Sequence, residues 1–318
     1  MSQIVPLVVI LGPTASGKSA LAMEVARRWE GEVVCCDSTQ LYRHFDIGTS
    51  KLRGAEQRGV PHHLMDLLEP HEVFTAGDYR RKALEVLAEL RRRRRLPVLT
   101  AGTGLYLRAL LEGLADAPGR SEELRERLRR RSRQRGAEYL HRLLARLDPP
   151  TAARVATRDA AKLIRAIEVC LASGRPMSEL LRQPRPRLEG FQALKVGLMP
   201  SRAALYERID RRTRAMLEAG WAEEVRSLLA RGFDPSLKPF QFIGYSELRA
   251  HLSGVVDLET AVRAIQQATR RYAKRQITWF RREPGVDWFE GFGDDPALAG
   301  KVFALLGSRL DRPAAAQA

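Results

Sequence analysis

The stretch VVILGPTASGKSALA at residues 8–22 limits the possible folds of this chain more than any other feature. An apolar run at 5–11 precedes a glycine-rich loop, and an amphipathic segment at 17–29 follows it. The loop, GPTASGKS, matches the phosphate-binding pattern G-x-x-x-x-G-K-[ST] at every position. We therefore predict a buried strand, a phosphate-binding loop (P-loop) and a helix, in that order.

Two glycines and two side chains give this loop its predicted chemistry. Gly12 and Gly17 allow the backbone to curl so that its N–H groups converge on phosphate oxygens, and the helix N-terminus adds its dipole. Lys18 supplies a mobile positive charge, and the Ser19 hydroxyl is a predicted ligand of Mg²⁺. Most such loops bind ATP or GTP, so the identity of the phosphates depends on the rest of the sequence.

Strands and helices alternate through the first third of the chain. Residues 32–36 and 96–100 are predicted strands, 77–93 is a predicted helix, and another helix begins near Gly104. Strands that alternate with helices of this length indicate a parallel α/β sheet. Together with the loop, they predict a P-loop NTPase-like core.

An almost wholly helical, arginine-rich segment begins after DAPG at 116–119. Residues 120–187 hold 18 basic and 8 acidic residues, a net charge of +10. Strand-like sequence returns at 194–199, and further helices are predicted at 201–218, 221–231 and 258–282. The simplest organisation is a P-loop α/β core, formed by residues 1–115 and 194–318, with a basic helical insertion at 116–193.

The composition of the whole chain favours a polyanionic partner. The net charge is +16, the pI is near 10.4, and arginine, which binds phosphate through a two-pronged fork, far outnumbers lysine. Nucleic acid is therefore favoured over an unremarkable basic surface.

Cys35, Cys36 and Cys170 have no zinc-site spacing and cannot form a disulfide framework, so we expect a reducing cytoplasm and no metal cluster. No segment resembles a membrane span or a targeting signal.

Asp37 directly follows the predicted strand at 32–36, at the edge where open parallel sheets bind ligands. Its carboxylate could coordinate Mg²⁺ as a Walker-B acid, take a proton from a nucleophile, or cap the next turn. An apolar strand ending in Asp-Glu and an N-K-x-D motif are both missing, which argues against an ordinary ATPase or GTPase.

In AGTGLYLRAL at 101–110, the glycines either present Thr103 to a ligand or form a plain tight turn.

Two paired patterns allow two interpretations each. The adjacent His62 and His63 favour hydrogen-bonded structural histidines over a metal site. Arg208 and Arg212, four residues apart on one predicted helical face, form either a phosphate clamp or a charged stripe.

The stretch ATRRYAKRQITWFRR at 268–282 mixes basic and aromatic residues in one predicted helix. Such a surface can stack bases and bind phosphates. Equally, Tyr272, Trp279 and Phe280 can be core residues with the arginines on the solvated face.

Eight sequence motifs, in the same order, resemble those of one family, the tRNA dimethylallyltransferases, also called tRNA isopentenyl transferases. One motif alone would be weak evidence for the family, but eight in order are highly specific. The resemblance implies a P-loop core with a helical insertion that binds tRNA. It also implies transfer of a dimethylallyl group from its diphosphate to N6 of adenosine 37, beside the tRNA anticodon, with release of diphosphate. The resemblance covers the chain from residue 4 to about 289. Its motifs are GPTASGKS, DSTQLYRHFDIGTSK, PHHLMD, AGTGLYLRAL, DAAKLIRAIEV, LYERIDRRTRAML, FIGYSEL and ATRRYAKRQITWFRR.

The resemblance further implies a role for each matching residue. Asp37 is the expected general base at N6, with Thr103 and Lys18 as further catalytic residues, and Ser19 is the expected Mg²⁺ ligand. The expected diphosphate ligands are Gly12, Pro13, Thr14, Ala15, Ser16, Gly17, Lys18 and Ser19 of the P-loop, then Arg212, Arg208 and Arg275. The expected tRNA ligands are Asp37, Ser38, Thr39, Gln40 and Thr103, and, inside the insertion, Ala161, Lys162, Leu163, Ile164 and Arg165.

The expected protein is a cytoplasmic, monomeric, bacterial-type enzyme that binds the anticodon stem-loop and no membrane. The sequence departs from the family's usual pattern at Ala101, where glycine is common, and around Lys51, where the usual alanine and proline are missing. The C-terminal zinc finger of eukaryotic members is also missing. Two alternatives are a P-loop small-molecule kinase, which has no use for the basic insertion, and a non-catalytic RNA-binding P-loop protein.

Overall fold

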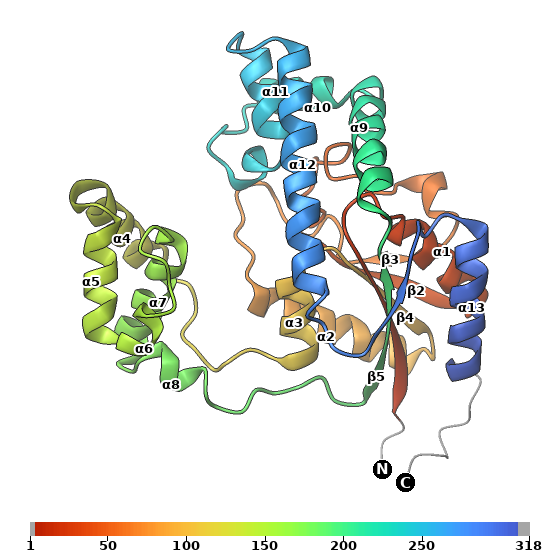
Figure 1. Cartoon of the computed structure of the whole chain (residues 1–318), viewed down its shortest axis with the longest axis horizontal. Helices are drawn as coiled ribbons and strands as arrows, with labels where there is room; N and C mark the ends of the chain where they lie inside the picture. The colour runs from red at the N-terminus through yellow and green to blue at the C-terminus, as the bar shows by residue number, and fades with distance from the viewer. Residues whose placement is uncertain (1–3, 311–318) are drawn as a thin grey trace. The chain divides into compact units, whose positions relative to one another are not determined.

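The computed structural model describes residues 4–310 of the 318-residue chain. It divides into two compact units. The larger unit, which we call the core, combines Met1–Leu111 with Leu188–Ala318, and the smaller, the insertion, is Glu112–Arg187. Each unit is described here by itself (Figure 1).

The core is built on one sheet of six parallel strands, in the order β3-β2-β4-β1-β5-β6 (Figure 1). The parallel α/β prediction is thus confirmed. Strand β1 lies between β4 and β5 and is buried on both faces, because Leu7 and Val9 pack into one apolar cluster and Val8 and Ile10 into another. The strands are β1 (Val5–Leu11), β2 (Gly31–Cys36), β3 (His62–His63), β4 (Leu96–Ala101), β5 (Phe191–Leu198) and β6 (Val286–Phe289).

Helices cover both faces of this sheet, as a parallel sheet requires. On one face, α1 (Lys18–Arg28) and α13 (Pro296–Leu310) pack against the strands. On the other face lie α2 (Ala76–Arg92) and α3 (Gly104–Glu112). The N-terminus of α2 is fixed by a capping box, in which Thr75 accepts from Asp78 N and Asp78 in turn binds Thr75 N.

A group of four helices follows β5 and continues the core (Figure 1). The longest, α12 (Leu258–Phe280), is capped by Asp257 and packs on α9 through Ala273, Leu205 and Ile209. The other helices of the group are α9 (Arg202–Glu218), α10 (Trp221–Ala230) and α11 (Tyr245–Leu252).

The insertion is wholly helical and has an apolar core of its own, which includes Leu128, Leu140 and Leu163. Glu168 is buried in it and pairs with Arg125 and Arg165, at 2.8 and 2.7 Å. The segments Pro149–Ala152 and Met177–Leu180 are single helical turns. The helices are α4 (Glu122–Arg135), α5 (Ala137–Leu147), α6 (Pro149–Ala152), α7 (Ala160–Ser173) and α8 (Met177–Leu180).

The predicted elements of the core agree with the structure to within a few residues. The sequence missed the strands β3 and β6, the helices α11 and α13, and two short 3-10 helices, η1 (Gly54–Gln57) and η2 (Lys238–Gln241). Both residues of β3 are hydrogen-bonded histidines, as interpreted, since His62 Nδ1 contacts Val60 O and His63 Nε2 contacts Glu32. The three cysteines are free and buried. None of the helices between residues 4 and 310 is long and apolar enough to span a bilayer.

Candidate active site

Three loops meet at the carboxyl edge of the central strands. Because β2, β4 and β1 are neighbours, Asp37 after β2 and Gly102 after β4 lie beside the P-loop that follows β1. Gly102 N and Thr103 N both donate to Cys36 O, at 3.1 and 2.9 Å, and tie the β4–α3 turn to the end of β2. Parallel sheets bind their ligands at this edge.

Asp37 is half-buried, and its two carboxylate oxygens have different surroundings. Oδ1 accepts hydrogen bonds from Thr39 N at 2.9 Å and from Thr39 Oγ1 at 2.7 Å. Oδ2 lies against Gly102, where a Cβ would come within 2.5 Å of it, so a larger residue at 102 would displace the carboxylate. Within residues 4–310 no hydrogen bond is made to Oδ2. One oxygen therefore fixes the carboxylate and the other is available to a ligand.

Thr103 supports the segment that follows Asp37. Its Oγ1 accepts a hydrogen bond from Ser38 N at 3.0 Å and donates one to Ser38 Oγ at 3.2 Å. The hydroxyl of Tyr272 on α12 reaches Gly102 O at 3.4 Å. The turn at 102–104 is thus both tight and directed at the site, and the two interpretations of its glycines are compatible.

Two half-buried cations face the same space, and neither has a carboxylate partner among residues 4–310. Lys18 Nζ donates to Pro13 O at 2.7 Å, and burial lowers the pKa of Lys18 to about 8, although nearby Asp37 opposes this shift. Arg212 Nη1 approaches Thr14 Oγ1 at 3.5 Å, and burial, with Arg208 adding to it, lowers the pKa of Arg212. Neither cation forms an ion pair in the part of the chain that the structure describes. Two cations without a carboxylate partner are suited to bind an anion.

The P-loop adds a further unsatisfied group. Ser16 is fully buried, and its Oγ has no hydrogen-bond partner in the described part of the chain. Buried hydroxyls are normally bonded, so this one marks a place for a ligand oxygen. Ser19, at the first turn of α1, lines the same hollow as Ser16 and Lys18.

The other two predicted diphosphate ligands are placed differently. Arg208 makes two hydrogen bonds to Asp294, both at 2.7 Å, and stacks on Phe292 with its guanidinium 4.6 Å from the ring centroid. Arg275 is exposed, lies near Tyr272 and lines the neighbouring cavity. Arg212 is therefore the arginine of the three that faces the P-loop without a carboxylate.

Gln276 on α12 links the P-loop to the turn after β4, although no pattern in the sequence singled it out. Its Oε1 accepts from Thr14 N at 2.7 Å, and its Nε2 donates to Gly102 O at 2.8 Å. The side chain is 6% exposed. The Thr14 amide is therefore engaged by protein, and the loop amides that remain for phosphate begin at Ala15. A glutamine in an arginine-rich helical stretch gives no local signal of such a contact.

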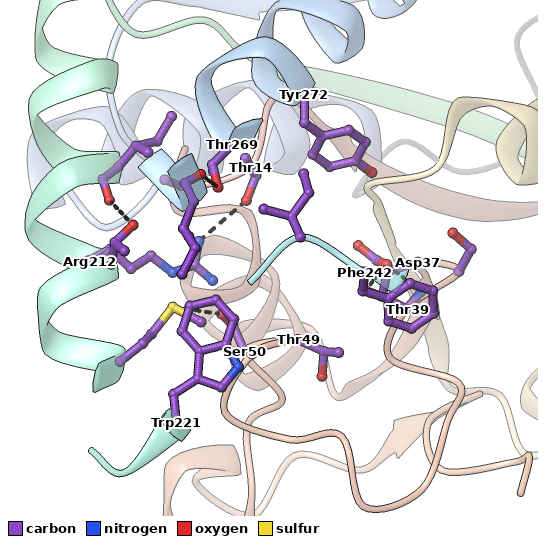
Figure 2. A pocket seen from close by; sticks show the side chains of 18 of the residues that line it. Thr14, Asp37, Thr39, Thr49, Ser50, Arg212, Trp221, Phe242, Thr269 and Tyr272 are labelled. Atoms are coloured by element: carbon purple, nitrogen blue, oxygen red, sulfur yellow. Dashed lines mark hydrogen bonds between the residues drawn. The ribbon is translucent and has the colours of Figure 1, made fainter. Parts of the chain in front are cut away.

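The site opens into two adjoining cavities that share Thr14, Asp37 and Arg212. One, of about 530 Å³, is lined by the P-loop and is polar. The other, of about 340 Å³, extends between α9, α10 and α12 (Figure 2). Its walls include Ile209, Met216, Trp221, Phe242, Ile243 and Ile265.

Two threonines make the walls of the smaller cavity more apolar than their composition suggests. The hydroxyls of Thr213 and Thr269 donate to the carbonyls of Ile209 and Ile265 on their own helices, at 2.9 and 2.8 Å. Because those hydroxyls are satisfied within the helices, the cavity receives little polarity from them. The more polar cavity, with its half-buried cations, thus adjoins a more apolar one, and Asp37 lies on their shared border.

One carboxylate from α10 holds the loop between the two cavities. Glu224 accepts hydrogen bonds from Asp46 N at 2.9 Å, from Ile47 N at 2.8 Å and from the Tyr245 hydroxyl at 2.6 Å. On the other side, the buried Lys51 pairs with Asp46 and with Asp66. Lys51, around which the sequence departs from the usual pattern, therefore has a structural role here.

The predicted tRNA ligands in the core differ in how far they are already engaged. Ser38 and Thr39 line the apolar cavity. Gln40 lies deeper: its amide donates to Thr49 O at 3.0 Å and to Ser50 O at 3.2 Å, and its Oε1 accepts from Cys35 Sγ. Gln40 thus supports the cavity wall.

In the insertion, the predicted stretch 161–165 forms the first turns of α7. Leu163 and Ile164 point into the insertion's apolar core. Ala161 and Lys162 are exposed, and Lys162 pairs with the helix cap Asp159 at 2.6 Å. The side chains of this stretch that can contact RNA are thus those of Ala161, Lys162 and the half-buried Arg165.

Comparison with known proteins identifies the family. The model of the family described as "IPP transferase" matches residues 40–283. The chain belongs to this family. It is 53% identical over 300 residues to a tRNA dimethylallyltransferase of Koribacter versatilis, covering 94% of this chain and 97% of that one. It is 50% identical over 293 residues to that of Solibacter usitatus, covering 92% and 95%.

Solved structures of IPP transferase family members share the fold. The tRNA isopentenylpyrophosphate transferase of Bacillus halodurans is 35% identical, with a TM-score of 0.70 and coverage of 96% of this chain and 97% of that one. A eukaryotic dimethylallyltransferase, described as acting on tRNA, is 25% identical with a TM-score of 0.83, over 97% and 80% of the chains. The kinase alternative finds no support in these matches.

Proposed function

We propose that this chain transfers a dimethylallyl group from dimethylallyl diphosphate to N6 of adenosine 37 in tRNA and releases diphosphate. The main observation for this proposal is the border between the two cavities. Lys18 lines the polar cavity, Arg212 and Asp37 line both cavities, and apolar side chains form much of the second one; neither cation has a carboxylate partner within residues 4–310. A diphosphate with a short apolar tail has the matching distribution of charge and apolar surface.

The proposed reaction is one displacement. The N6 lone pair of the flipped adenine forms a bond to C1 of the dimethylallyl group, the bond from C1 to the diphosphate oxygen breaks, and Asp37 takes the N6 proton. Oδ2 is the oxygen suited to that proton, because Oδ1 is already bonded to Thr39. Negative charge that develops on the departing diphosphate is stabilised by Lys18, Arg212 and the loop amides.

The donor set also fits the proposed Mg²⁺, because hydroxyl, carboxylate and phosphate oxygens are the ligands that this ion prefers. Ser19 would hold the ion, and Asp37 lines the same cavity. When bound, Mg²⁺ would neutralise part of the diphosphate charge.

Three further assignments remain part of the proposal. The insertion is proposed to bind the stem of the anticodon arm through the excess of 10 positive charges in its residues 120–187. Ser38, Thr39 and Thr103 are proposed to contact the anticodon loop near adenosine 37. With tRNA as its substrate and three free cysteines, the enzyme is proposed to work as a monomer in the cytoplasm.

Labelled dimethylallyl diphosphate, unmodified tRNA transcript and Mg²⁺ test the function directly. We expect label in the RNA, and none when adenosine 37 is replaced by guanosine, which has no exocyclic amine at position 6. Phosphate release from ATP in the presence of small-molecule acceptors, with no label in RNA, would favour the kinase. Binding of tRNA with neither activity would favour the regulatory RNA-binding protein.

Removal of the Gln276 bridge is expected to lower kcat/KM by about 10- to 100-fold, the cost of misplacing reactive groups by a fraction of an ångström or more. Gln276→Leu removes both hydrogen bonds, whereas Gln276→Glu keeps an acceptor for Thr14 N and loses the donor to Gly102 O. Steady-state kinetics, with tRNA affinity and thermal unfolding as controls, test this. Unchanged kcat/KM in Gln276→Leu would show that the bridge does not position the loop.

Affinity for dimethylallyl diphosphate is expected to fall as the pH rises through about 8. The pKa of Lys18 in the free protein is about 8, so the lysine is charged below this pH and neutral above it. Binding the diphosphate anion favours charged Lys18, and above pH 8 the complex must take up a proton, which costs about tenfold in affinity per pH unit. Calorimetric titration from pH 7 to 9.5 measures this, and a flat profile would contradict it.

Affinity for the anticodon stem-loop is expected to fall by about 10- to 100-fold between 50 and 200 mM salt, because each neutralised phosphate contributes about 0.7–0.9 to the logarithmic slope. Arg127→Glu with Arg130→Glu, both on exposed positions of α4, should reduce the slope. The matched control is Arg81→Glu with Lys82→Glu on α2 of the core. Equal slopes for both variants would exclude the α4 surface of the insertion as the stem contact.

A further inference from the structure

The three aromatic residues of α12, for which the sequence allowed two interpretations, differ in their exposure to solvent. Phe280 is buried, at 1% exposure, and belongs to the main apolar core. Tyr272 is half-buried and points toward the cavity of Figure 2. Trp279, in contrast, is 42% exposed. An indole that is neither core nor cavity wall needs another explanation.

Trp279 stands beside the turn that adjoins the proposed general base. Tyr272, Gln276 and Trp279 are spaced four and three residues apart, which places them on one face of α12. The first two reach Gly102 O, and the indole lies over Gly104, where a Cβ would come within 2.2 Å of the ring. The same helical face therefore follows the turn from Gly102 past Thr103 to Gly104.

Positive charge flanks the exposed indole along the helix. Arg275 lies one turn before Trp279, and Arg282 lies just after the end of the helix, held by a hydrogen bond from its N–H to Trp279 O at 3.1 Å. Both arginines are exposed, and neither forms an ion pair among residues 4–310. Several arginines elsewhere in this helical group, such as Arg214 and Arg270, are paired with carboxylates at 2.9 Å. A stacking surface between two unpaired cations complements a base between two phosphates.

We propose that Trp279 is a stacking platform for the base next to the target adenosine in the RNA. This inference rests on the proposed function. When an adenosine is flipped out of its stack, each neighbouring base loses a stacking partner. An exposed aromatic side chain beside the reactive centre can replace that partner, and Arg275 and Arg282 bind the phosphates on either side. Trp279 would thereby hold the loop open and not merely bind it.

The test compares two exposed tryptophans. Trp288 is 38% exposed and packs against Gly197 on β5, in a hollow lined by Arg202, Lys274 and Arg281, away from the turn at 102–104. We expect Trp279→Ala to weaken binding of the anticodon stem-loop by about 5- to 100-fold, the range for loss of one stacked base. Trp279→Phe should retain most of the affinity, and Trp288→Ala should bind as the wild type does.

Trp279→Leu separates stacking from packing. Leucine still covers Gly104 with apolar surface but has no aromatic face, so a purely structural role predicts near-normal binding and a stacking role predicts the loss seen with alanine. Thermal unfolding of each variant identifies any that fail to fold. Affinity for dimethylallyl diphosphate should be unchanged in every folded variant.

An abasic nucleotide on either side of the adenosine identifies the stacked base. If Trp279 stacks on it, the abasic RNA and Trp279→Ala are not additive, because the second change removes a contact already lost. Full additivity at both neighbours, or wild-type binding by folded Trp279→Ala and Trp279→Leu, would overturn the proposal. If the variants give these results and the wild-type enzyme still labels tRNA, the stacking proposal is wrong and the proposed function stands. If the wild-type enzyme does not label tRNA, the proposed function itself is rejected.

Discussion

Asp37→Asn is expected to reduce prenyl transfer by about 10²- to 10⁴-fold, the usual contribution of a positioned general base. The amide has nearly the shape of the carboxylate, and its oxygen can still accept from Thr39 N and Oγ1. It has no basic oxygen to take the N6 proton. Single-turnover transfer of label measures the loss, and affinities for stem-loop and dimethylallyl diphosphate should change by only about twofold or less.

The matched control for Asp37→Asn is Glu56→Gln, which removes a carboxylate from the rim of the same polar cavity. Glu56 is exposed and accepts a hydrogen bond from Arg53 N, so the substitution should leave transfer near its wild-type rate. A loss of RNA binding in Asp37→Asn with the single-turnover rate preserved would contradict its role as the base. In that case Asp37 would be a tRNA contact held by Thr39.

Lys18→Met is expected to lower kcat/KM for dimethylallyl diphosphate by about 10²- to 10³-fold, as for loss of one preorganised donor at a developing oxyanion. The lysine lies in the P-loop with its Nζ on Pro13 O, from which it can turn to a bound phosphate. Methionine keeps the length and apolar stem of the side chain and removes the charge. Calorimetry with dimethylallyl diphosphate and steady-state kinetics measure the effect, with stem-loop affinity as the unaffected quantity.

Thermal unfolding distinguishes this role of Lys18 from a structural one. The ammonium is buried without a carboxylate partner within residues 4–310, so removal of its charge should leave the melting temperature unchanged or raise it. Lys51 provides the comparison: it is buried between Asp46 and Asp66, and Lys51→Met should destabilise the fold, because the two acids would then rely on the exposed Arg53. A melting temperature that falls equally in both variants would show that Lys18 is a structural ion.

The core helices and strands that the sequence predicted are those with a clear local pattern. Buried β1 follows from an unbroken apolar run, and α1 from the glycine loop before it and the apolar spacing after it. The missed strands lack such patterns. Strand β3 is two histidines long, β6 has four residues, and both exist because a neighbouring strand offers its edge. Their formation depends on partners distant in the chain.

By itself, the sequence determined the phosphate-binding loop, the parallel α/β core, the basic insertion and Asp37 as the residue beside the loop. These properties depend on the local spacing of residues and on their charge, both of which can be read from consecutive positions. Only the tertiary structure decided how residues far apart combine. Gln276 joins the P-loop to the turn after β4 across 262 and 174 residues, Arg208 is bound by Asp294 while Arg212 is not, and Trp279 is exposed while Phe280 is buried. The physical reason is that partner choice and burial are set by packing between elements, which no local pattern encodes.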